Sequence, residues 1–176
     1  MNSVRVLVLG GFLLLGACVE PTPPPQPQPP APAPVPPPPP PAPPPTGDWR
    51  DVPLSRGSWS YRQDASGSQA LFGLPNFQPS FVVRCDQASR TITLSRQGTT
   101  SGNTMTVRTS FGQRNFPLSV QTDPAPYVYS RLPAGDTFLD MVAFSRGRFT
   151  VEVPGTEMLI IPSWQEPARV IEDCRG

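Results

Sequence analysis

The residues of this chain best suited to covalent chemistry are its three cysteines. The sequence contains no histidine. The absence of histidine removes the commonest general base, the commonest metal ligand and the usual partner of a catalytic serine or cysteine. Cys18 stands alone between an apolar run and a run of prolines, while Cys85 and Cys174 both lie beyond the prolines. The chemistry open to these thiols is therefore modification at Cys18 and pairing, redox or metal chemistry at the other two.

The residues around Cys18 indicate attachment of lipid. Residues 6–15 are apolar apart from two glycines, and ten helical residues would rise about 15 Å, half of a bilayer core. This length is typical of a signal-peptide core and too short for a membrane span. The following "LGAC", Leu15 to Cys18, resembles the lipobox of bacterial lipoproteins, with glycine where alanine or serine is usual. The alternative is an ordinary secreted protein with a stray cysteine.

The lipobox resemblance implies an order of events at the N-terminus. The thiol of Cys18 takes a diacylglycerol, residues 1–17 are removed as a signal peptide, and the new amine is acylated, so that palmitate-like chains hold residues 18–20 at the bilayer. Two or three chains anchor firmly, whereas one anchors only marginally. Val19, rather than aspartate, would follow the lipidated cysteine. By the sorting rule of enteric bacteria, this favours the outer membrane, with the protein facing the periplasm.

A proline-rich linker occupies residues 21–45, where 18 of 25 residues are proline and none is charged. Proline fixes φ and lacks an N–H, so helix and sheet are excluded and polyproline II is expected. At about 3.1 Å per residue, such a segment spans roughly 75 Å. We favour a stalk that holds a domain away from the membrane. A docking ligand for an aromatic groove and a neutral, disordered tether are the alternatives.

Cys85 and Cys174 are expected to form a disulfide, because an exported protein meets an oxidising compartment. Redox chemistry or metal binding is the alternative, and it has little support without a C-x-x-C pair or a histidine. The closed loop would be about 90 residues long, for which the chain-entropy model gives roughly 4–5 kcal/mol of stabilisation.

Two arginines are candidate anion- or partner-binding residues. Arg146 and Arg148 flank Gly147 at the expected start of a strand, and guanidinium groups grip carboxylates and phosphates through two parallel hydrogen bonds. The alternative is a pair of solvent-facing arginines that bind nearby acids such as Asp140 or Glu152.

The tryptophans could form a binding cleft for a sugar or peptide. Trp49, Trp59 and Trp164 are the only three in the chain. We favour the alternative, in which they pack in the core and at its rim.

No residue set predicts an enzyme. Glu166, Glu172 and Asp173 surround the last expected helix, and paired carboxylates hydrolyse glycosides, but surface acids usually serve solvation. The serines of 55–58 and 65–68 have neither a histidine nor a lysine as partner, because the chain also lacks lysine. No phosphate-binding loop, dinucleotide fingerprint or EF-hand spacing occurs. We therefore expect no catalytic residues, no cofactor and no metal.

Residues 46–176 are expected to form one mainly β domain, an antiparallel β-sandwich or sheet. In such strands apolar and polar residues alternate, so that one face of the sheet is polar. A turn at 86–89 would join two of them as a hairpin, and Pro117 would confine its strand to an edge or an end. Net charge is near +1, without a polybasic block, so we expect no nucleic-acid partner. The expected strands are 58–63, 81–85, 91–96, 103–110, 114–118, 148–153 and 158–162.

Two helices complete the expected domain. The spacing of apolar residues predicts a helix over 134–145, with Asp136 as its N-cap. A terminal helix is predicted over 166–174, with Pro167 at position N1, where its missing N–H costs nothing. That helix would carry Cys174 inward toward Cys85.

The segments "AFSRGRF", 143–149, and "RVIEDCR", 169–175, resemble those of uncharacterised alphaproteobacterial lipoproteins. The layout is similar, more distantly, to the invasion-associated locus B family of periplasmic proteins. Neither resemblance implies a defined chemistry. Together with the lipobox and linker, they predict a non-enzymatic envelope lipoprotein that binds the bilayer through Cys18. Its domain would contact an envelope protein or peptidoglycan. The alternative is a small-ligand or glycan binder, or an inhibitor of wall hydrolases.

Overall fold

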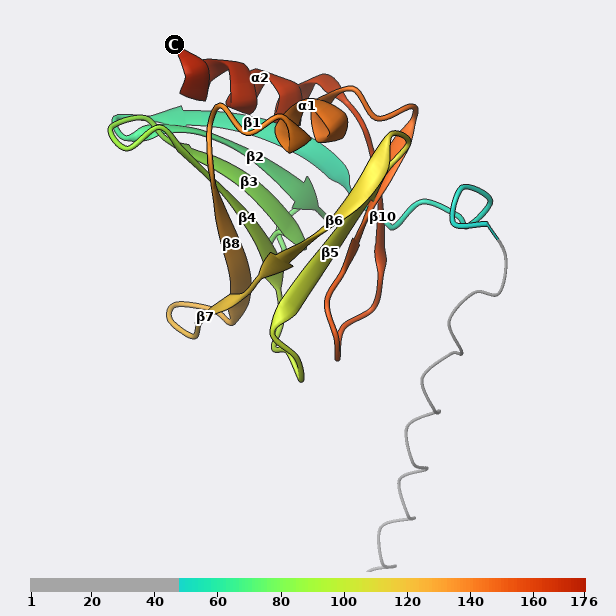
Figure 1. The fold of residues 1–176 in the computed structure, drawn as a ribbon. Coiled ribbons are helices and arrows are strands. Elements are labelled where there is room, and N and C mark those ends of the chain that lie inside the picture. Colours follow the sequence, from blue (N-terminus) through green and yellow to red (C-terminus); the bar gives the residue numbers. More distant parts are fainter. Residues whose placement is uncertain (1–47) are drawn as a thin grey trace, which may run out of the picture. The chain divides into compact units, whose positions relative to one another are not determined.

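Alternation of apolar and polar residues produces two antiparallel sheets in the computed structural model, which describes residues 48–176 (Figure 1). The expectations for residues 1–17, 18–20 and 21–45 lie outside the described residues. The larger sheet contains β1 (Ser58–Asp64), β2 (Gly67–Gly73), β3 (Phe81–Asp86), β4 (Thr91–Gln97), β7 (Ser119–Gln121) and β8 (Tyr127–Pro133). The smaller sheet contains β5 (Thr104–Thr109), β6 (Gly112–Pro117), β9 (Arg148–Glu152) and β10 (Leu159–Pro162).

The strand order places distant segments side by side. The larger sheet runs β1-β2-β3-β4-β8-β7, so β8 lies beside β4 although three strands separate them in sequence. The smaller sheet runs β10-β9-β5-β6. The expected hairpin joins β3 to β4, and Pro117 ends the edge strand β6, as its missing N–H requires.

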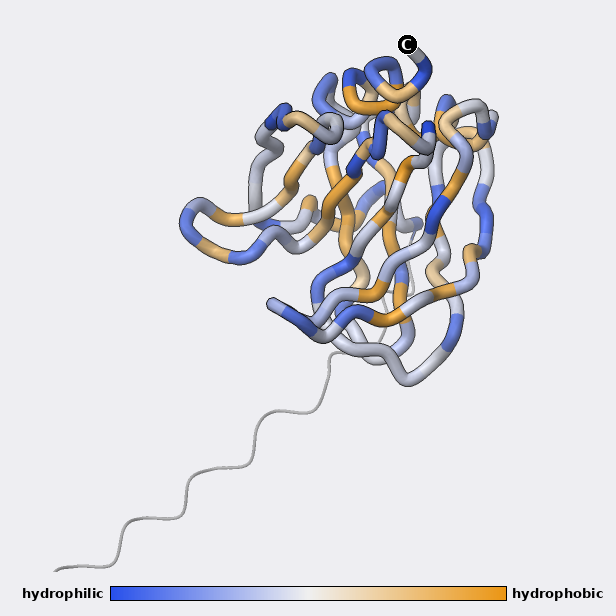
Figure 2. The backbone as a smooth tube through the Cα atoms, turned by 90° about the vertical axis from the view of Figure 1, so that its left-hand side faces the viewer, coloured by the Kyte–Doolittle hydropathy of each residue, from blue (hydrophilic) through white to orange (hydrophobic). Residues whose placement is uncertain are grey.

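The strands β3, β4 and β8 of the larger sheet bury alternate residues. On β4, Ile92 and Leu94 are fully buried, whereas Thr91, Thr93 and Ser95 on the opposite face remain partly exposed. Figure 2 shows hydrophobic residues interleaved with hydrophilic ones along the strands. The outer face of this sheet is therefore free to carry polar side chains.

Aromatic side chains join the two sheets. Phe81 of the larger sheet meets Phe149 of the smaller one edge-on, with 6.1 Å between ring centroids, and also contacts Trp59 at 6.4 Å. All three rings are buried. The two sheets thus pack face to face around one core, and the predicted β-sandwich is confirmed.

Gly67 fixes the first hairpin. It begins β2 with φ of +148°, and a Cβ there would lie 2.3 Å from the carbonyl oxygen of Cys85. Only glycine tolerates both this backbone conformation and this approach. The backbone of the β1–β2 hairpin therefore packs closely against the end of β3.

Both predicted helices exist, with different ends. The first, α1, spans Phe138–Ala143, which is shorter than the predicted 134–145. Its N-cap position is Thr137 rather than Asp136, although the Asp136 carboxylate accepts the N–H of Phe138 at 2.8 Å. Asp136 therefore provides the capping hydrogen bond as predicted, because Thr137 has helical dihedral angles (φ −65°, ψ −18°) and makes no side-chain cap bond of its own.

The terminal helix α2 spans Gln165–Arg175. Pro167 is its third residue rather than its first, so the predicted N1 position is wrong. The first four N–H groups of a helix have no internal partner, so proline is harmless here too. Figure 1 shows α1 and α2 beside each other across one end of the sheets, and α2 contacts β1, β2, β3 and β4. No helix within residues 48–176 is long and apolar enough to cross a membrane.

The sequence did not predict β2, β7 and β8. The core face of β8 holds Ser130 between Val128 and Leu132, which interrupts its apolar alternation. The buried Ser130 hydroxyl donates to the carbonyl of Pro117 at 2.6 Å, a partner that only the folded chain supplies.

Candidate functional site

The predicted disulfide is confirmed. Cys85 near the end of β3 and Cys174 in the last turn of α2 are bonded, with 5.4 Å between their Cα atoms. Both residues are buried, and the bond holds α2 across one end of the larger sheet. While they are bonded to each other, the two cysteines offer no free thiolate as a metal ligand. Within residues 48–176 no group of three or more potential metal-ligating side chains occurs.

The structure gives Arg146 and Arg148 different partners. The guanidinium of Arg146 lies over the ring of Phe111 at 5.7 Å, in the turn between β5 and β6. The guanidinium of Arg148 donates to the carbonyl of Val52 at 2.6 Å and thereby fastens the segment that precedes β1. Each side chain therefore serves a separate contact.

The acids proposed as alternative partners of these arginines bind other arginines. Asp140 accepts from Arg175 at 2.7 Å, and Glu152 lies 3.8 Å from Arg108. The expectation that Asp140 or Glu152 pairs with Arg146 or Arg148 is wrong.

The three tryptophans do not share a cleft. Trp59 lies in the core, where its indole N–H donates to the carbonyl of Pro162 at 2.8 Å. Trp49 is buried beside the turn between β5 and β6, and Trp164 is half exposed at the start of α2. The favoured interpretation, core and rim packing, holds for Trp49 and Trp59.

The acids of α2 have separate environments. Asp173 accepts a hydrogen bond from the Tyr61 hydroxyl at 2.6 Å, and this bond raises the pKa of Tyr61. Glu172 is exposed and Glu166 is partly buried.

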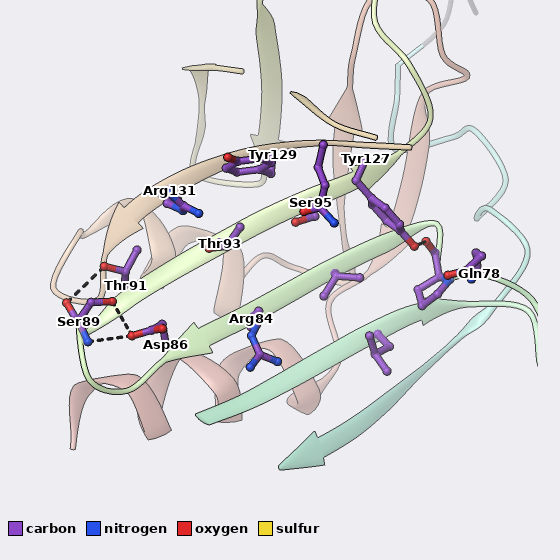
Figure 3. A pocket seen from close by; sticks show the side chains of 14 residues that line it. Gln78, Arg84, Asp86, Ser89, Thr91, Thr93, Ser95, Tyr127, Tyr129 and Arg131 are labelled. Atoms are coloured by element: carbon purple, nitrogen blue, oxygen red, sulfur yellow. Dashed lines mark hydrogen bonds between the residues drawn. The ribbon is translucent and has the colours of Figure 1, made fainter. Parts of the chain in front are cut away.

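A cleft of about 650 Å³ lies on the outer face of the larger sheet, away from the core (Figure 3). Its volume falls within the range of small-molecule sites. None of its lining residues is buried, so all are accessible to a ligand. The lining consists of polar, aromatic and apolar side chains from β2, β3, β4, β7, β8 and two loops: Leu71, Gln78, Pro79, Val82, Arg84, Asp86, Ser89, Thr91, Thr93, Ser95, Gln121, Tyr127, Tyr129 and Arg131.

Strand register arranges these side chains in rows across the sheet. Thr93 on β4 pairs with Arg84 on β3 and with Arg131 on β8, so two arginines flank one threonine. The next outward-facing row pairs Ser95 with Tyr129. Neighbouring strands lie about 4.8 Å apart, which places the two arginine backbones roughly 10 Å from each other. The cleft therefore has one cationic row and, beside it, a row with hydroxyl groups.

Arg84 is held at the edge of the cleft. Its guanidinium donates to the Asp64 carboxylate at 3.1 Å and to the Ser66 hydroxyl at 2.6 Å. Both partners belong to the hairpin between β1 and β2. Arg84 therefore already has a carboxylate partner, Asp64, in the absence of a ligand.

The Asp64 carboxylate gives this hairpin a pH dependence. Hydrogen bonds from the hydroxyl and N–H of Ser66, followed by those from Arg84, lower the pKa of Asp64 from 3.8 to about 2. A carboxyl whose pKa is lower in the folded state stabilises the fold above pH 3.8. That contribution is lost as the pH falls through about 2.

We expect the Ser66→Ala substitution to raise the pKa of Asp64 toward 3.8, because it removes the strongest of these hydrogen bonds. Arg84→Gln should raise it less. An NMR titration of the Asp64 carboxyl carbon checks both variants. An unchanged pKa in the Ser66 variant would contradict this account.

Arg131 has no carboxylate partner among residues 48–176. Its guanidinium lies over the Tyr129 ring at 5.0 Å, which positions it without neutralising it. Asp86, the only acid in the lining, accepts the N–H of Ser89 at 2.8 Å and its hydroxyl at 2.6 Å (Figure 3). These bonds chiefly lower the pKa of Asp86, and Arg84 and Arg131 lower it further. Arg131 is thus the free cation of the cleft.

Tyr127 closes the opposite end of the cleft. Its hydroxyl donates to the carbonyl of Pro79 at 2.7 Å, and its partial burial raises its pKa. The bond ties β8 to the loop between β2 and β3, which also supplies Gln78. The ring of Tyr127 therefore forms a fixed wall.

Sequence reasoning found only part of this surface. The strands over 81–85 and 91–96, which carry Arg84 and the outward threonines of β4, were predicted. Tyr127, Tyr129 and Arg131 were missed because β8 was not predicted. The alternation of Tyr, Tyr and Arg with Val128 and Leu132 was the available signal.

No family model matches this chain, and neither a curated protein nor a solved structure gives a significant match. The resemblance to alphaproteobacterial lipoproteins and to the invasion-associated locus B family therefore stays a prediction.

Proposed function

We propose that this chain is a non-enzymatic lipoprotein of the bacterial envelope that binds the cell wall or an envelope partner through the cleft of its larger sheet. The observation that carries the proposal is the cleft itself. It combines a free arginine, a fixed tyrosine wall and outward hydroxyl groups on rigid strands. Binding sites built on strands hold their side chains in place more closely than sites on loops.

The composition of the cleft supports binding rather than catalysis. A glycosidase needs two carboxyl groups that flank the scissile bond, whereas the lining contains one, Asp86. The hydroxyl of Ser89 donates to that same carboxylate, and the chain has no histidine to activate it as a nucleophile. The residues of the cleft are therefore equipped to hold a ligand.

The sequence around Cys18 supports anchoring of the domain. A signal-peptide core, a lipobox-like "LGAC" and a proline-rich linker follow one another within the first 45 residues. Acylated Cys18 would hold the chain in the outer membrane, facing the periplasm, and residues 21–45 would set the distance. The disulfide fits an oxidising compartment of this kind.

Crosslinking in the cells that make the protein tests this proposal. We expect the full chain to capture a specific envelope protein or peptidoglycan, and the Cys18→Ser variant to lose it, because the domain is no longer presented at the membrane. The captured material is identified by mass spectrometry and by muramic acid analysis.

Two results would contradict the proposal. Capture of nothing above background by a folded, accessible full chain would remove the binding function. Capture of the same set by Cys18→Ser would remove the role of the anchor.

A further inference from the structure

Four residues in the middle of the cleft present polar groups without protein partners. Within residues 48–176, the hydroxyls of Thr93, Ser95 and Tyr129 make no hydrogen bond, and the guanidinium of Arg131 makes no hydrogen bond or ion pair. Backbone pairing sets Thr93 beside Arg131 and Ser95 beside Tyr129. Directly opposed side chains on one sheet face have Cβ atoms about 4.5–5.5 Å apart. The four groups therefore converge on one small area of ligand.

The free guanidinium determines the charge of the ligand. Arg131 lies against the Tyr129 ring and forms no ion pair within residues 48–176, so its N–H groups are free to bind a carboxylate through parallel hydrogen bonds. Arg84, on the other side of Thr93, is already engaged by Asp64 and Ser66. Of the two arginines in the cleft lining, only Arg131 thus has no ion-pair partner within residues 48–176.

The remaining charge excludes highly anionic ligands. Asp86 lies at the same end of the cleft as the two arginines, and its lowered pKa keeps it ionised at neutral pH. A second negative group of the ligand would meet this carboxylate. A polyphosphate or a nucleic acid is therefore disfavoured, and a ligand with isolated carboxylates fits.

The other lining residues determine the body of the ligand. Tyr127, Tyr129, Leu71 and Val82 supply aromatic and apolar surface, while Thr93 and Ser95 supply hydroxyl groups. A sugar ring has the matching combination of apolar C–H faces and equatorial hydroxyl groups. Because every lining residue is at least partly exposed, the cleft suits part of a longer chain that lies across the sheet.

We propose that the cleft binds a saccharide chain that carries a carboxylate. Arg131 holds the carboxylate, and Thr93, Ser95 and Tyr129 bind hydroxyl or amide groups of the adjoining sugar. This inference rests on the proposed binding function and names its ligand class. Such a ligand could come from peptidoglycan or from a polysaccharide in which uronic acids are separated by neutral sugars, and both sources present isolated carboxylates beside sugar rings.

Calorimetric titration of the full chain with Cys18→Ser tests the inference. The probes are soluble disaccharide-peptides of peptidoglycan, an oligosaccharide in which a uronic acid alternates with neutral sugars and, as the neutral comparison, a chitin oligomer of equal length. We expect binding of at least one acidic probe, and binding of the neutral oligomer at least tenfold weaker. The acidic probe that binds identifies the source.

Matched variants assign the effect to the cleft. Arg131→Gln should weaken binding of the acidic probe about 10- to 100-fold, because it removes a charge-assisted pair. Tyr129→Phe, which deletes a single hydroxyl, should weaken it several-fold. The control is Arg62→Gln, an exposed arginine in the same row of the sheet but outside the cleft, which should leave binding unchanged. Tyr129→Phe also serves as the second test if Arg131→Gln does not fold.

Three results would overturn the inference. They are equal binding of neutral and acidic oligomers, binding unaffected by Arg131→Gln and Tyr129→Phe, and binding of none of the probes. If no probe binds while crosslinking in cells still captures a partner in an anchor-dependent manner, the ligand class is wrong and the proposed function stands.

Discussion

Joint replacement of Cys85 and Cys174 by alanine is expected to lower the free energy of unfolding by about 4–5 kcal/mol. The bond joins residues 89 positions apart, so its loss restores the freedom of a loop that spans most of the domain. Domains of this size have only about 5–15 kcal/mol of net stability, and the loss is therefore a large share of it. Urea unfolding, followed by tryptophan fluorescence, to which the buried Trp49 and Trp59 contribute, measures the difference.

Reductant provides the control for this prediction. It should lower the stability of the native chain toward that of the double variant and leave the double variant unchanged. A difference below about 1 kcal/mol between oxidised and reduced native chain would contradict a chain-entropy role for the bond.

The disulfide also supports the candidate site. Successive residues of β3 point to opposite faces, so Cys85 faces the core while Arg84 and Asp86 face the cleft. The bond to α2 therefore fixes the strand end from which these two charged residues project.

Substitution of Phe81 by alanine is expected to cost about 3–5 kcal/mol of unfolding free energy. The ring is 1% exposed and lies between Trp59 of its own sheet and Phe149 of the facing one. Its removal leaves a cavity between the sheets that neighbouring rings fill only in part. Chemical denaturation measures the loss. The slope of the unfolding free energy against denaturant concentration should stay unchanged.

Two further variants show whether position determines this cost. Phe81→Leu retains most of the apolar volume, so we expect a smaller loss. Phe144→Ala deletes a ring of the same size that is 64% exposed, and it should change stability by no more than about 0.5 kcal/mol. Equal losses at Phe81 and Phe144 would argue against the face-to-face packing of the two sheets.

Local patterns in the sequence were sufficient for much of the fold. Period-2 alternation identified the strands that contain Trp59, Ile92 and Val107, because each has large apolar residues on one face and polar ones on the other. The apolar spacing around Leu139 identified α1, although it overestimated its length. The strand β8 escaped because Ser130 occupies a core position, where only a tertiary hydrogen bond makes serine acceptable.

The candidate site depended on information that no short segment contains. Thr93 and Arg131 lie 38 positions apart and become neighbours only because β8 pairs with β4 across the chain that forms β5, β6 and β7. Arg84 donates hydrogen bonds to Asp64 and Ser66 of another hairpin. Arg131 has no such partner in the described part of the chain, because Asp86 accepts its hydrogen bonds from Ser89. The sequence by itself determined which residues alternate, which cysteines pair and that the domain is mainly β, since these follow from local periodicity and from thiol chemistry. The tertiary structure alone decided which arginine is unpaired and which polar face is hollowed, because strand order and hydrogen-bond competition are properties of the whole folded domain.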